Sequence, residues 1–211
     1  MNISVILLWG VIIVGGFLLG SIMFSRMLPL IICKKDICAI SPDKNPGAAN
    51  VFSCLGIPMG MLCLFCDLLK GFIPVYAGVC LLDVRHMAFA AVLAAPVLGH
   101  AIAPFDHFRG GKCIATAFGV MLGIMPITRI GFLLAALYIF FSVIFRINPT
   151  RLRSIVTFSL FGVISFVVML LTEKGSVAFG CALVSAIATA KHTKRFSHIP
   201  EEEKSKAEER A

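Results

Sequence analysis

Charged side chains are scarce in this sequence. Lys, Arg, Asp and Glu make up 14% of its 211 residues, whereas soluble domains carry about 25% on average. Apolar residues reach 59%, and the mean hydropathy is +0.96. This composition excludes an ordinary soluble domain and predicts an integral membrane protein.

Positive charge is also missing ahead of the first apolar run, because Arg26 is the first basic residue. A secretory signal peptide has a basic segment before its apolar stretch and a small-residue cleavage pattern after it. Neither feature is present, so we expect no cleaved signal peptide.

Several apolar runs approach the length that a helix needs to cross a membrane, which is about 20 residues. The fourth and the seventh are short, so tilt or burial among neighbours has to explain them. We expect an all-α membrane protein with about seven transmembrane helices, near residues 3–25, 53–82, 86–105, 113–126, 128–146, 154–172 and 176–190.

Basic residues are distributed unequally between the two predicted sides of the membrane. One side has only Arg85, Arg129 and Lys174. Because cytoplasmic connections are richer in Lys and Arg, this asymmetry predicts an N-terminus outside and a C-terminus in the cytoplasm. It also predicts that four polar connections, near residues 33–52, 106–112, 146–154 and 191–195, share one face and converge on a basic site. The richer side holds Arg26, Lys34, Lys35, Lys44, Arg109, Lys112, Arg146, Arg151, Arg153, Lys191, Lys194 and Arg195.

The domain organisation is simple. We expect one transmembrane domain over residues 1–195 and a polar cytoplasmic tail over residues 196–211, with no internal repeat and no separate soluble domain. The first long connection, residues 33–52, is too polar to cross lipid and contains proline and glycine, which predicts a structured loop.

The eight cysteines lie mostly inside apolar runs, which favours small core residues over disulfides. Cys63 and Cys66 form a C-x-x-C pattern with no histidine or second cysteine pair nearby. A zinc site needs such partners. We therefore expect no metal ion and no cofactor.

The stretch FRGGKC, residues 108–113, interrupts the apolar pattern. Gly110 and Gly111 let backbone amides approach a ligand, and Lys112 adds a full charge. A helix that begins near Cys113 would point its free N–H groups at the same place, and such an arrangement binds phosphate. A flexible loop with one topology-setting lysine is the alternative.

A nucleotide-triphosphatase loop is disfavoured at this position. The pattern G-x-x-x-x-G-K-[ST] requires glycine where Asp106 stands and a hydroxyl residue where Cys113 stands. His100 and Asp106 are spaced like the H-x-x-x-x-D motif of acyltransferases with one residue too many. We do not expect Asp106 to orient His100, although either side chain can contact substrate.

Two charges interrupt the second apolar run. Asp67 and Lys70 stand three residues apart, and a lone charge in mid-bilayer costs about 2.5–3.5 kcal/mol. We expect them to face each other or a wet cavity, either as a structural ion pair or as substrate contacts. Small-residue pairs that suit close helix packing occur at Gly16/Gly20, Gly56/Gly60 and Gly119/Gly123.

Taken together, these segments resemble the bacterial acyl-phosphate:glycerol-3-phosphate acyltransferases, small seven-span membrane enzymes of phospholipid synthesis. The similarity covers most of the chain, and the order and spacing of the segments are specific. The matching segments are GSIMFS (20–25), NPGAANVFSCLG (45–56), DLLKG (67–71) and GHAIAPFDHFRGGKCIAT (99–116).

The resemblance implies an activity and a site. A fatty acyl group would pass from acyl phosphate to glycerol 3-phosphate at the bacterial plasma membrane, giving lysophosphatidate and inorganic phosphate. The partners would be these two substrates and membrane lipids, with no nucleic acid. Lys112 and His100 would be the catalytic residues, and substrate would contact Asn45, Gly47, Asn50, Gly110, Gly111, Ser154 and His192.

The chain also departs from the family pattern. Asp43 replaces a serine, Ser53 an arginine, Arg151 a serine and Cys113 a glycine, and Lys194 and Arg195 replace the Glu and Asn that follow the family's histidine. Asp43 would repel a phosphate unless Lys44, Arg151 or Arg195 pairs with it, so we expect binding to survive better than catalysis. Two other hypotheses stay open: a non-catalytic member that binds lipid phosphates or a partner enzyme, and a small transporter for an anionic metabolite.

Overall fold

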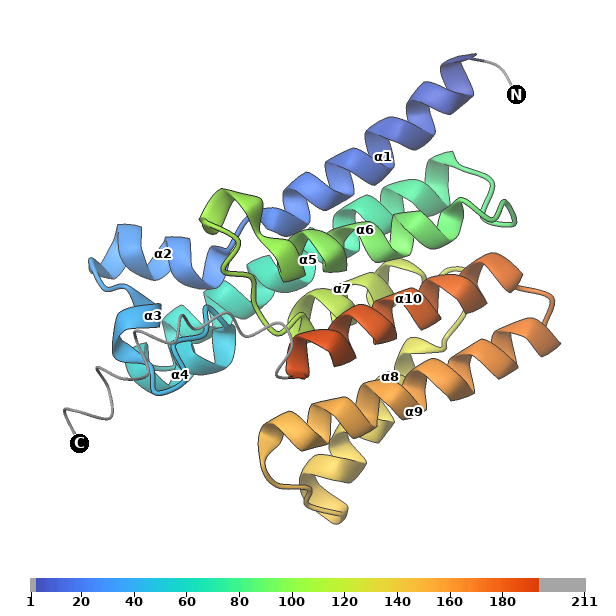
Figure 1. Cartoon of the computed structure of the whole chain (residues 1–211). Coiled ribbons are helices and arrows are strands. Elements are labelled where there is room, and N and C mark those ends of the chain that lie inside the picture. The colour runs from blue at the N-terminus through green and yellow to red at the C-terminus, as the bar shows by residue number, and fades with distance from the viewer. Residues whose placement is uncertain (1–2, 194–211) are drawn as a thin grey trace.

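The computed structural model describes residues 3–193, and every regular element in that range is helical (Figure 1). The expected tail at 196–211, together with Lys194 and Arg195, lies outside the described residues. The elements are α1 (Ile3–Ser21), α2 (Phe24–Cys33), α3 (Ile37–Ile40), α4 (Ala48–Leu55), α5 (Ile57–Leu81), α6 (Phe89–Ile102), the 3-10 turn η1 (Pro104–Asp106), α7 (Ile114–Gly123), α8 (Gly131–Ile139), the π-helical turn η2 (Phe140–Ile144), α9 (Thr150–Leu171) and α10 (Gly175–His192).

Within residues 3–193, four helical segments are long and apolar enough to cross a membrane: α1, α5, α6 with η1, and α9. All seven predicted apolar runs lie in helices, which confirms an all-α membrane protein. We expected the fourth and the seventh runs to be the short ones, and this was only partly right. The seventh forms the 18-residue helix α10, whereas the fourth forms α7 with only 10 residues and the fifth is divided between α8 and η2.

The first apolar run is broken, which the hydropathy did not indicate. Helix α1 ends at Ser21 and α2 begins at Phe24, so backbone N–H and C=O groups between them lack the hydrogen bonds of a continuous helix. In an apolar environment each of these backbone groups needs a partner within the protein. The ammonium of Lys70 supplies one, because it donates a hydrogen bond of 2.6 Å to the carbonyl oxygen of Ile22.

Asp67 and Lys70 face each other, which was one of the two arrangements expected from the sequence. Lys70 Nζ lies 2.9 Å from Asp67 Oδ1, and the two side chains are 0% and 2% exposed. The hydroxyl of Ser25 donates to Asp67 Oδ2 at 2.5 Å. The ion pair on α5 therefore binds the break itself and the first turn of α2, which is a structural role.

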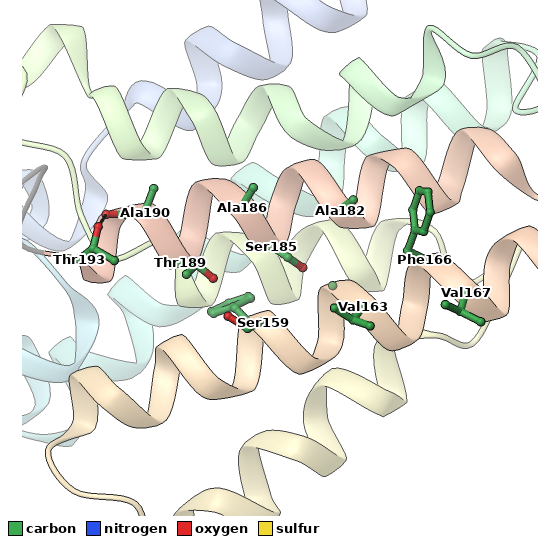
Figure 2. A pocket seen from close by; sticks show the side chains of 12 residues that line it. Ser159, Val163, Phe166, Val167, Ala182, Ser185, Ala186, Thr189, Ala190 and Thr193 are labelled. Atoms are coloured by element: carbon green, nitrogen blue, oxygen red, sulfur yellow. Dashed lines mark hydrogen bonds between the residues drawn. The ribbon is translucent and has the colours of Figure 1, made fainter.

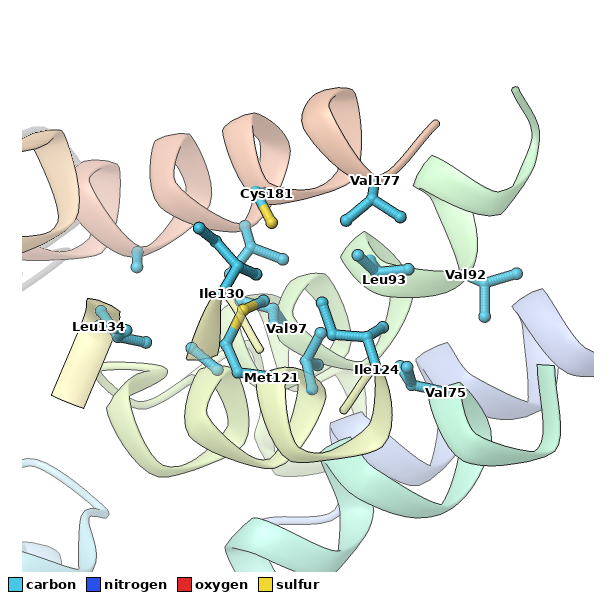
Figure 3. Packing of buried hydrophobic residues seen from close by; sticks show 14 of the residues in the cluster. Val75, Val92, Leu93, Val97, Met121, Ile124, Ile130, Leu134, Val177 and Cys181 are labelled. Carbon is cyan, nitrogen blue, oxygen red and sulfur yellow. The ribbon is translucent and has the colours of Figure 1, made fainter. Parts of the chain in front are cut away.

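Helix α6 lies at the centre of the bundle. It packs against α1 and α10, and α7 packs against α5 (Figure 1). The apolar core fills the space where α5, α6, α7 and α10 meet (Figure 3). Its buried side chains include Val75, Leu93, Val97, Met121, Ile124 and Cys181.

Two of the close helix crossings depend on glycine. A Cβ atom at Gly20 would lie 2.2 Å from the carbonyl oxygen of Pro96 in α6, and one at Gly119 would lie 2.0 Å from that of Leu68 in α5. The close packing predicted for these glycine pairs is thus confirmed. The prediction for Gly56 was wrong, because this residue has open space around it and a φ of +85°, and it forms the turn between α4 and α5.

All eight cysteines are free thiols, but only three of them are buried: Cys63, Cys113 and Cys181. Cys80 is exposed, and the other four are half-buried. The expectation of mostly core cysteines was therefore wrong. A surface that faces lipid is as apolar as a core, so an apolar run does not tell which side a cysteine faces.

The tight α1–α6 crossing predicts different effects of the same substitution at two sites in α1. Gly20→Ala would force the helices apart and destabilise the fold by about 1–3 kcal/mol. Gly10→Ala is the matched control, because a Cβ atom there would have no other atom within 4 Å, and it should be neutral or slightly stabilising. Thermal unfolding in detergent micelles would compare them, and equal melting temperatures would contradict the close crossing.

Candidate functional site

The polar connections gather at one end of the bundle (Figure 1). This end, hereafter the polar end, holds α2–α4, the segment 103–113, the connection 145–149 and the end of α10. The connections 82–88, 124–130 and 172–174 lie at the opposite end. The four connections that the charge pattern grouped together therefore do share one end.

Lys112 joins the first two connections. Its ammonium lies 2.5 Å from Asp43 Oδ2, and the two side chains are 39% and 43% exposed. The side-chain amide of Asn50, on α4, donates to Asp43 Oδ1 at 2.5 Å and to the carbonyl oxygen of Asn45 at 2.7 Å. The cation expected to neutralise Asp43 was Lys44, Arg151 or Arg195, but in the structure it is Lys112 itself.

The bonds around Asp43 keep its carboxylate ionised. Partial burial alone would raise the pKa of Asp43, but the hydrogen bonds from Lys112 and Asn50 outweigh it and lower that pKa below its usual range. Asp43 is therefore negatively charged at neutral pH, so it neutralises part of the charge of Lys112.

The end of α10 connects Lys112 to the third connection. The imidazole of His192 is only 4% exposed and lies near Lys112. Arg151, in the first turn of α9, donates a hydrogen bond from Nε to the carbonyl oxygen of His192. Asp43, Lys112, His192 and Arg151 thus lie near one another, and each belongs to a different one of the four connections.

Packing explains the two glycines of the FRGGKC segment. A Cβ atom at Gly110 would lie 1.9 Å from the carbonyl oxygen of Ala101, and one at Gly111 would lie 2.3 Å from Nε2 of His100. The Gly111 amide already donates to the carbonyl oxygen of His100 at 3.1 Å. The loop is therefore shaped by its contact with the end of α6, and the contact of Gly110 and Gly111 with substrate stays a prediction.

The backbone of the segment 103–113 is strained. Four non-glycine residues adopt a positive φ: Ala103, His107, Phe108 and Cys113, the last at 64° directly before α7. Each such residue costs on the order of 1–3 kcal/mol, and this kind of strain clusters at functional sites. Glycine adopts this conformation without strain, so the cysteine at position 113 adds strain at the start of α7.

His100 and Ser154 are placed differently from the predicted substrate contacts. His100 is 4% exposed and lies beneath Gly111. Ser154 is 2% exposed, its hydroxyl donates to the carbonyl oxygen of Thr150 and it accepts a 2.9 Å bond from the phenol of Tyr138. Both side chains therefore support the polar end from below, and their contact with substrate stays a prediction.

The start of α4 positions the remaining predicted residues. Gly47 precedes α4 and accepts hydrogen bonds from the amides of Asn50 and Val51. A Cβ atom at Gly47 would lie 2.7 Å from the amide nitrogen of the Asn45 side chain. Asn45, Gly47 and Asn50 thus form one compact turn beside Asp43.

Arg26 holds a second cluster at the polar end. It makes a two-point contact with Asp36, at 2.8 Å and 3.1 Å, and a 2.5 Å bond to Asp106. The hydrogen bond from Arg26 lowers the pKa of Asp36 despite its partial burial. Asp106 therefore bonds to Arg26. It does not orient His100, and this agrees with the expectation from the spacing of the two residues.

An open apolar groove runs between α9 and α10. It has a volume of about 670 Å³ and extends from Thr193 toward Val167 (Figure 2). Thr193 directly follows His192, whose carbonyl oxygen binds Arg151. The groove therefore meets the basic polar end at Thr193.

Three functional features were not apparent from the sequence: the partner of Lys112, the role of Arg26, and Tyr138 over Ser154. Arg26 and Asp36 offered a signal, because they are opposite charges close together after a long apolar run. Among residues 3–193, no group of three His, Cys, Asp or Glu side chains is arranged to hold a metal ion.

Comparison with known proteins identifies the family. The model for glycerol-3-phosphate acyltransferase matches residues 10–201. The glycerol-3-phosphate acyltransferases of Geotalea daltonii and Staphylococcus haemolyticus are 34% and 32% identical, over 90% of this chain and over 92% and 93% of their own lengths. The chain belongs to the glycerol-3-phosphate acyltransferase family.

The fold is shared with a solved member. Two crystal structures of PlsY (YgiH), an integral membrane glycerol 3-phosphate acyltransferase, each superpose with a TM-score of 0.73. The glycerol 3-phosphate form is 26% identical and covers 87% of this chain and 88% of that one. The lysophosphatidic acid form is 25% identical and covers 92% of both chains. The resemblance found in the sequence is therefore confirmed.

The Arg26 cluster predicts a pH-dependent loss of stability. Arg26 lowers the pKa of Asp36 in the folded protein. The stabilisation by the Arg26–Asp36 pair is therefore fully present above the usual aspartate pKa of about 3.9. It disappears as the pH falls through the lower pKa that Asp36 has in the folded protein. Arg26→Met should lower the free energy of unfolding by about 2 kcal/mol at pH 7. The gap to the unsubstituted protein should narrow below about pH 4.

Chemical denaturation at pH 7 and at pH 3.5 would measure that gap. Arg146→Met is the control, since Arg146 is exposed and has no side-chain partner among residues 3–193. An equal loss at both pH values for Arg26→Met would show that the ion pair does not cause it.

Proposed function

We propose that the protein transfers a fatty acyl group from acyl phosphate to glycerol 3-phosphate, forming lysophosphatidate. The observation that carries the proposal is the convergence of Lys112, His192 and Arg151 at the polar end, next to an apolar groove. A donor with a phosphate head and a fatty chain requires both features together. Membership of the glycerol-3-phosphate acyltransferase family supports the acceptor and the product.

The chemistry needs positioning more than a strong base. The acceptor hydroxyl oxygen attacks the acyl carbonyl carbon, the bond from that carbon to the phosphate oxygen breaks, and inorganic phosphate leaves with the electron pair. The hydroxyl proton can pass to the leaving phosphate. Lys112 would stabilise the charge that grows on this phosphate, which is an electrostatic contribution to the rate, and the ordered loop would align the reactants.

The α9–α10 groove is the proposed site of the acyl chain. Its lining is mostly apolar, with Phe158, Val163, Phe166 and Ala186 among its residues. A chain in this groove would place its phosphate beyond Thr193, toward His192 and Arg151. The remaining predicted contacts, Asn45, Gly47 and Asn50, would face the acceptor from the first connection.

The proposed membrane arrangement follows the charge pattern. Seven spans with the N-terminus outside would put the polar end in the cytoplasm, where the positive-inside rule expects its basic residues. The single transmembrane domain would cover residues 1–195, and 196–211 would be a cytoplasmic tail. Tight packing in the bundle would accommodate the short helix α7.

A non-catalytic member of the family is the second candidate. The specific observation in its favour is the carboxylate of Asp43 on Lys112, because it occupies the lysine on which the proposed catalysis depends. This candidate binds phosphorylated lipid precursors without turnover, so an assay of product formation separates the two.

Lys112→Ala tests the proposed role of the lysine. The purified protein, acyl phosphate and radiolabelled glycerol 3-phosphate should give labelled lysophosphatidate, and the variant should lower kcat by about 100-fold. Lys44→Ala is the control, since Lys44 is exposed at the same end and has no side-chain partner among residues 3–193. Absence of product from the unsubstituted protein would favour the non-catalytic candidate.

Filling the groove tests the site of the acyl chain. Ala186→Phe adds bulk to the groove lining and should raise the KM for a long-chain acyl phosphate about tenfold, because fewer methylene groups remain buried. Short-chain donors should be affected less. Leu183→Phe, at an exposed position of α10 outside the lining, should change neither the KM for long-chain donors nor the KM for short-chain donors. Equal effects on long and short donors would place the chain elsewhere.

A further inference from the structure

The carboxylate of Asp43 occupies the position on Lys112 that an anionic substrate would take. The ammonium and Asp43 Oδ2 are 2.5 Å apart, which is the distance of a direct charge-assisted hydrogen bond. Among residues 3–193, the other two carboxylates at the polar end, Asp36 and Asp106, are bound to Arg26. Asp43 is thus the carboxylate that competes with phosphate for Lys112.

Asp43 is held by its own loop as well as by the lysine. Its other oxygen accepts bonds from the Asn50 side chain at 2.5 Å and from the Asn45 amide at 3.3 Å. These bonds do not involve Lys112. The lysine can therefore move away from the carboxylate while the turn that carries Asp43 keeps its shape.

The contact is also open to exchange. Both side chains are more than a third exposed, and exposed ion pairs contribute little to stability because water and salt screen them. A phosphate dianion carries more charge than a carboxylate, so it competes well for the same ammonium. A phosphate and the Asp43 carboxylate on one lysine would repel each other.

Protonation is not what opens this contact. The pKa of Asp43 is lowered, so the carboxylate would become neutral only below the usual aspartate value of about 3.9. Lys112 is the charged group that faces Asp43, and the α4 side chain beside it, Asn50, is neutral. At neutral pH the carboxylate stays charged, so a phosphate has to compete with it for the lysine.

We infer that Asp43 is a built-in competitor for phosphate at Lys112, and that it limits how tightly the site holds both acyl phosphate and the product phosphate. The inference rests on the proposed function, because it assigns Lys112 to the donor phosphate. Each turnover would begin with displacement of the carboxylate by the donor. Return of the carboxylate to Lys112 would help inorganic phosphate to leave.

Asp43→Asn is the sharpest test, because it removes the charge and keeps an oxygen for the bonds from Asn50 and Asn45. Calorimetric titration of the purified full-length protein with inorganic phosphate needs no turnover. The variant should bind phosphate about three- to tenfold more tightly than the unsubstituted protein, since an exposed ion pair no longer opposes binding. In the acyl transfer assay, the KM for acyl phosphate and the inhibition constant of phosphate should fall by a similar factor.

Three further variants control the measurement. Asp83→Asn makes the same charge change at an exposed position of the connection 82–88, which lies at the opposite end, and should leave phosphate affinity unchanged. Asp43→Glu keeps the charge and should bind phosphate as weakly as the unsubstituted protein. In the presence of Lys112→Gln, the Asp43→Asn change should bring no gain, because there is no ammonium to release.

Unchanged or weaker phosphate binding by Asp43→Asn would overturn the inference and would make Asp43 a residue that positions Lys112. Asp43→Ser provides a second uncharged variant if the asparagine variant does not fold. Tighter binding without any lysophosphatidate from the unsubstituted protein would support the inference while refuting the proposed function. Product formation by the unsubstituted protein without tighter phosphate binding by Asp43→Asn would support the proposed function and refute the inference.

Discussion

The contact between Lys112 and Asp43 organises the polar end of the molecule. It joins the first polar connection to the glycine-containing loop before α7, and the same lysine lies near His192 at the end of α10. Arg151 then fastens α9 to α10. Four connections that are far apart in the sequence thereby meet around one cation.

The helical bundle places this cation accurately because its central crossings leave no space. Gly20 and Gly99 bring α1 against α6, and Gly110 and Gly111 press the loop onto the end of α6. The buried pair of Asp67 and Lys70 secures the break between α1 and α2. A site built on such a scaffold needs few mobile parts, which suits a reaction that depends on positioning and charge.

Patterns of apolar and basic residues predicted much of the fold. The hydropathy of the chain was enough to predict an all-α membrane protein, and the distribution of lysine and arginine was enough to group the polar connections at one end. Hydropathy could not reveal the break at Ile22, because the residues around it are as apolar as those of a continuous helix. The polar partner that stabilises the break, Lys70, lies 48 residues away.

The candidate site was predicted in outline but not in its contacts. Lys112 and its two glycines stood out because they interrupt an apolar pattern. Their partners did not, since Asp43 and Lys112 are separated by 69 residues and no periodicity relates them. Ser154 was selected for its hydroxyl, but its burial under Tyr138 follows from the packing of α8 against α9, which a single sequence does not show.

A structure with a non-hydrolysable acyl phosphonate bound would test the central claim most directly. The account predicts phosphonate oxygens within hydrogen-bonding distance of Lys112 Nζ, the Asp43 carboxylate displaced from the ammonium, and the acyl chain along the α9–α10 groove. A phosphonate bound elsewhere, with the Lys112–Asp43 contact intact and the groove free of the chain, would contradict it.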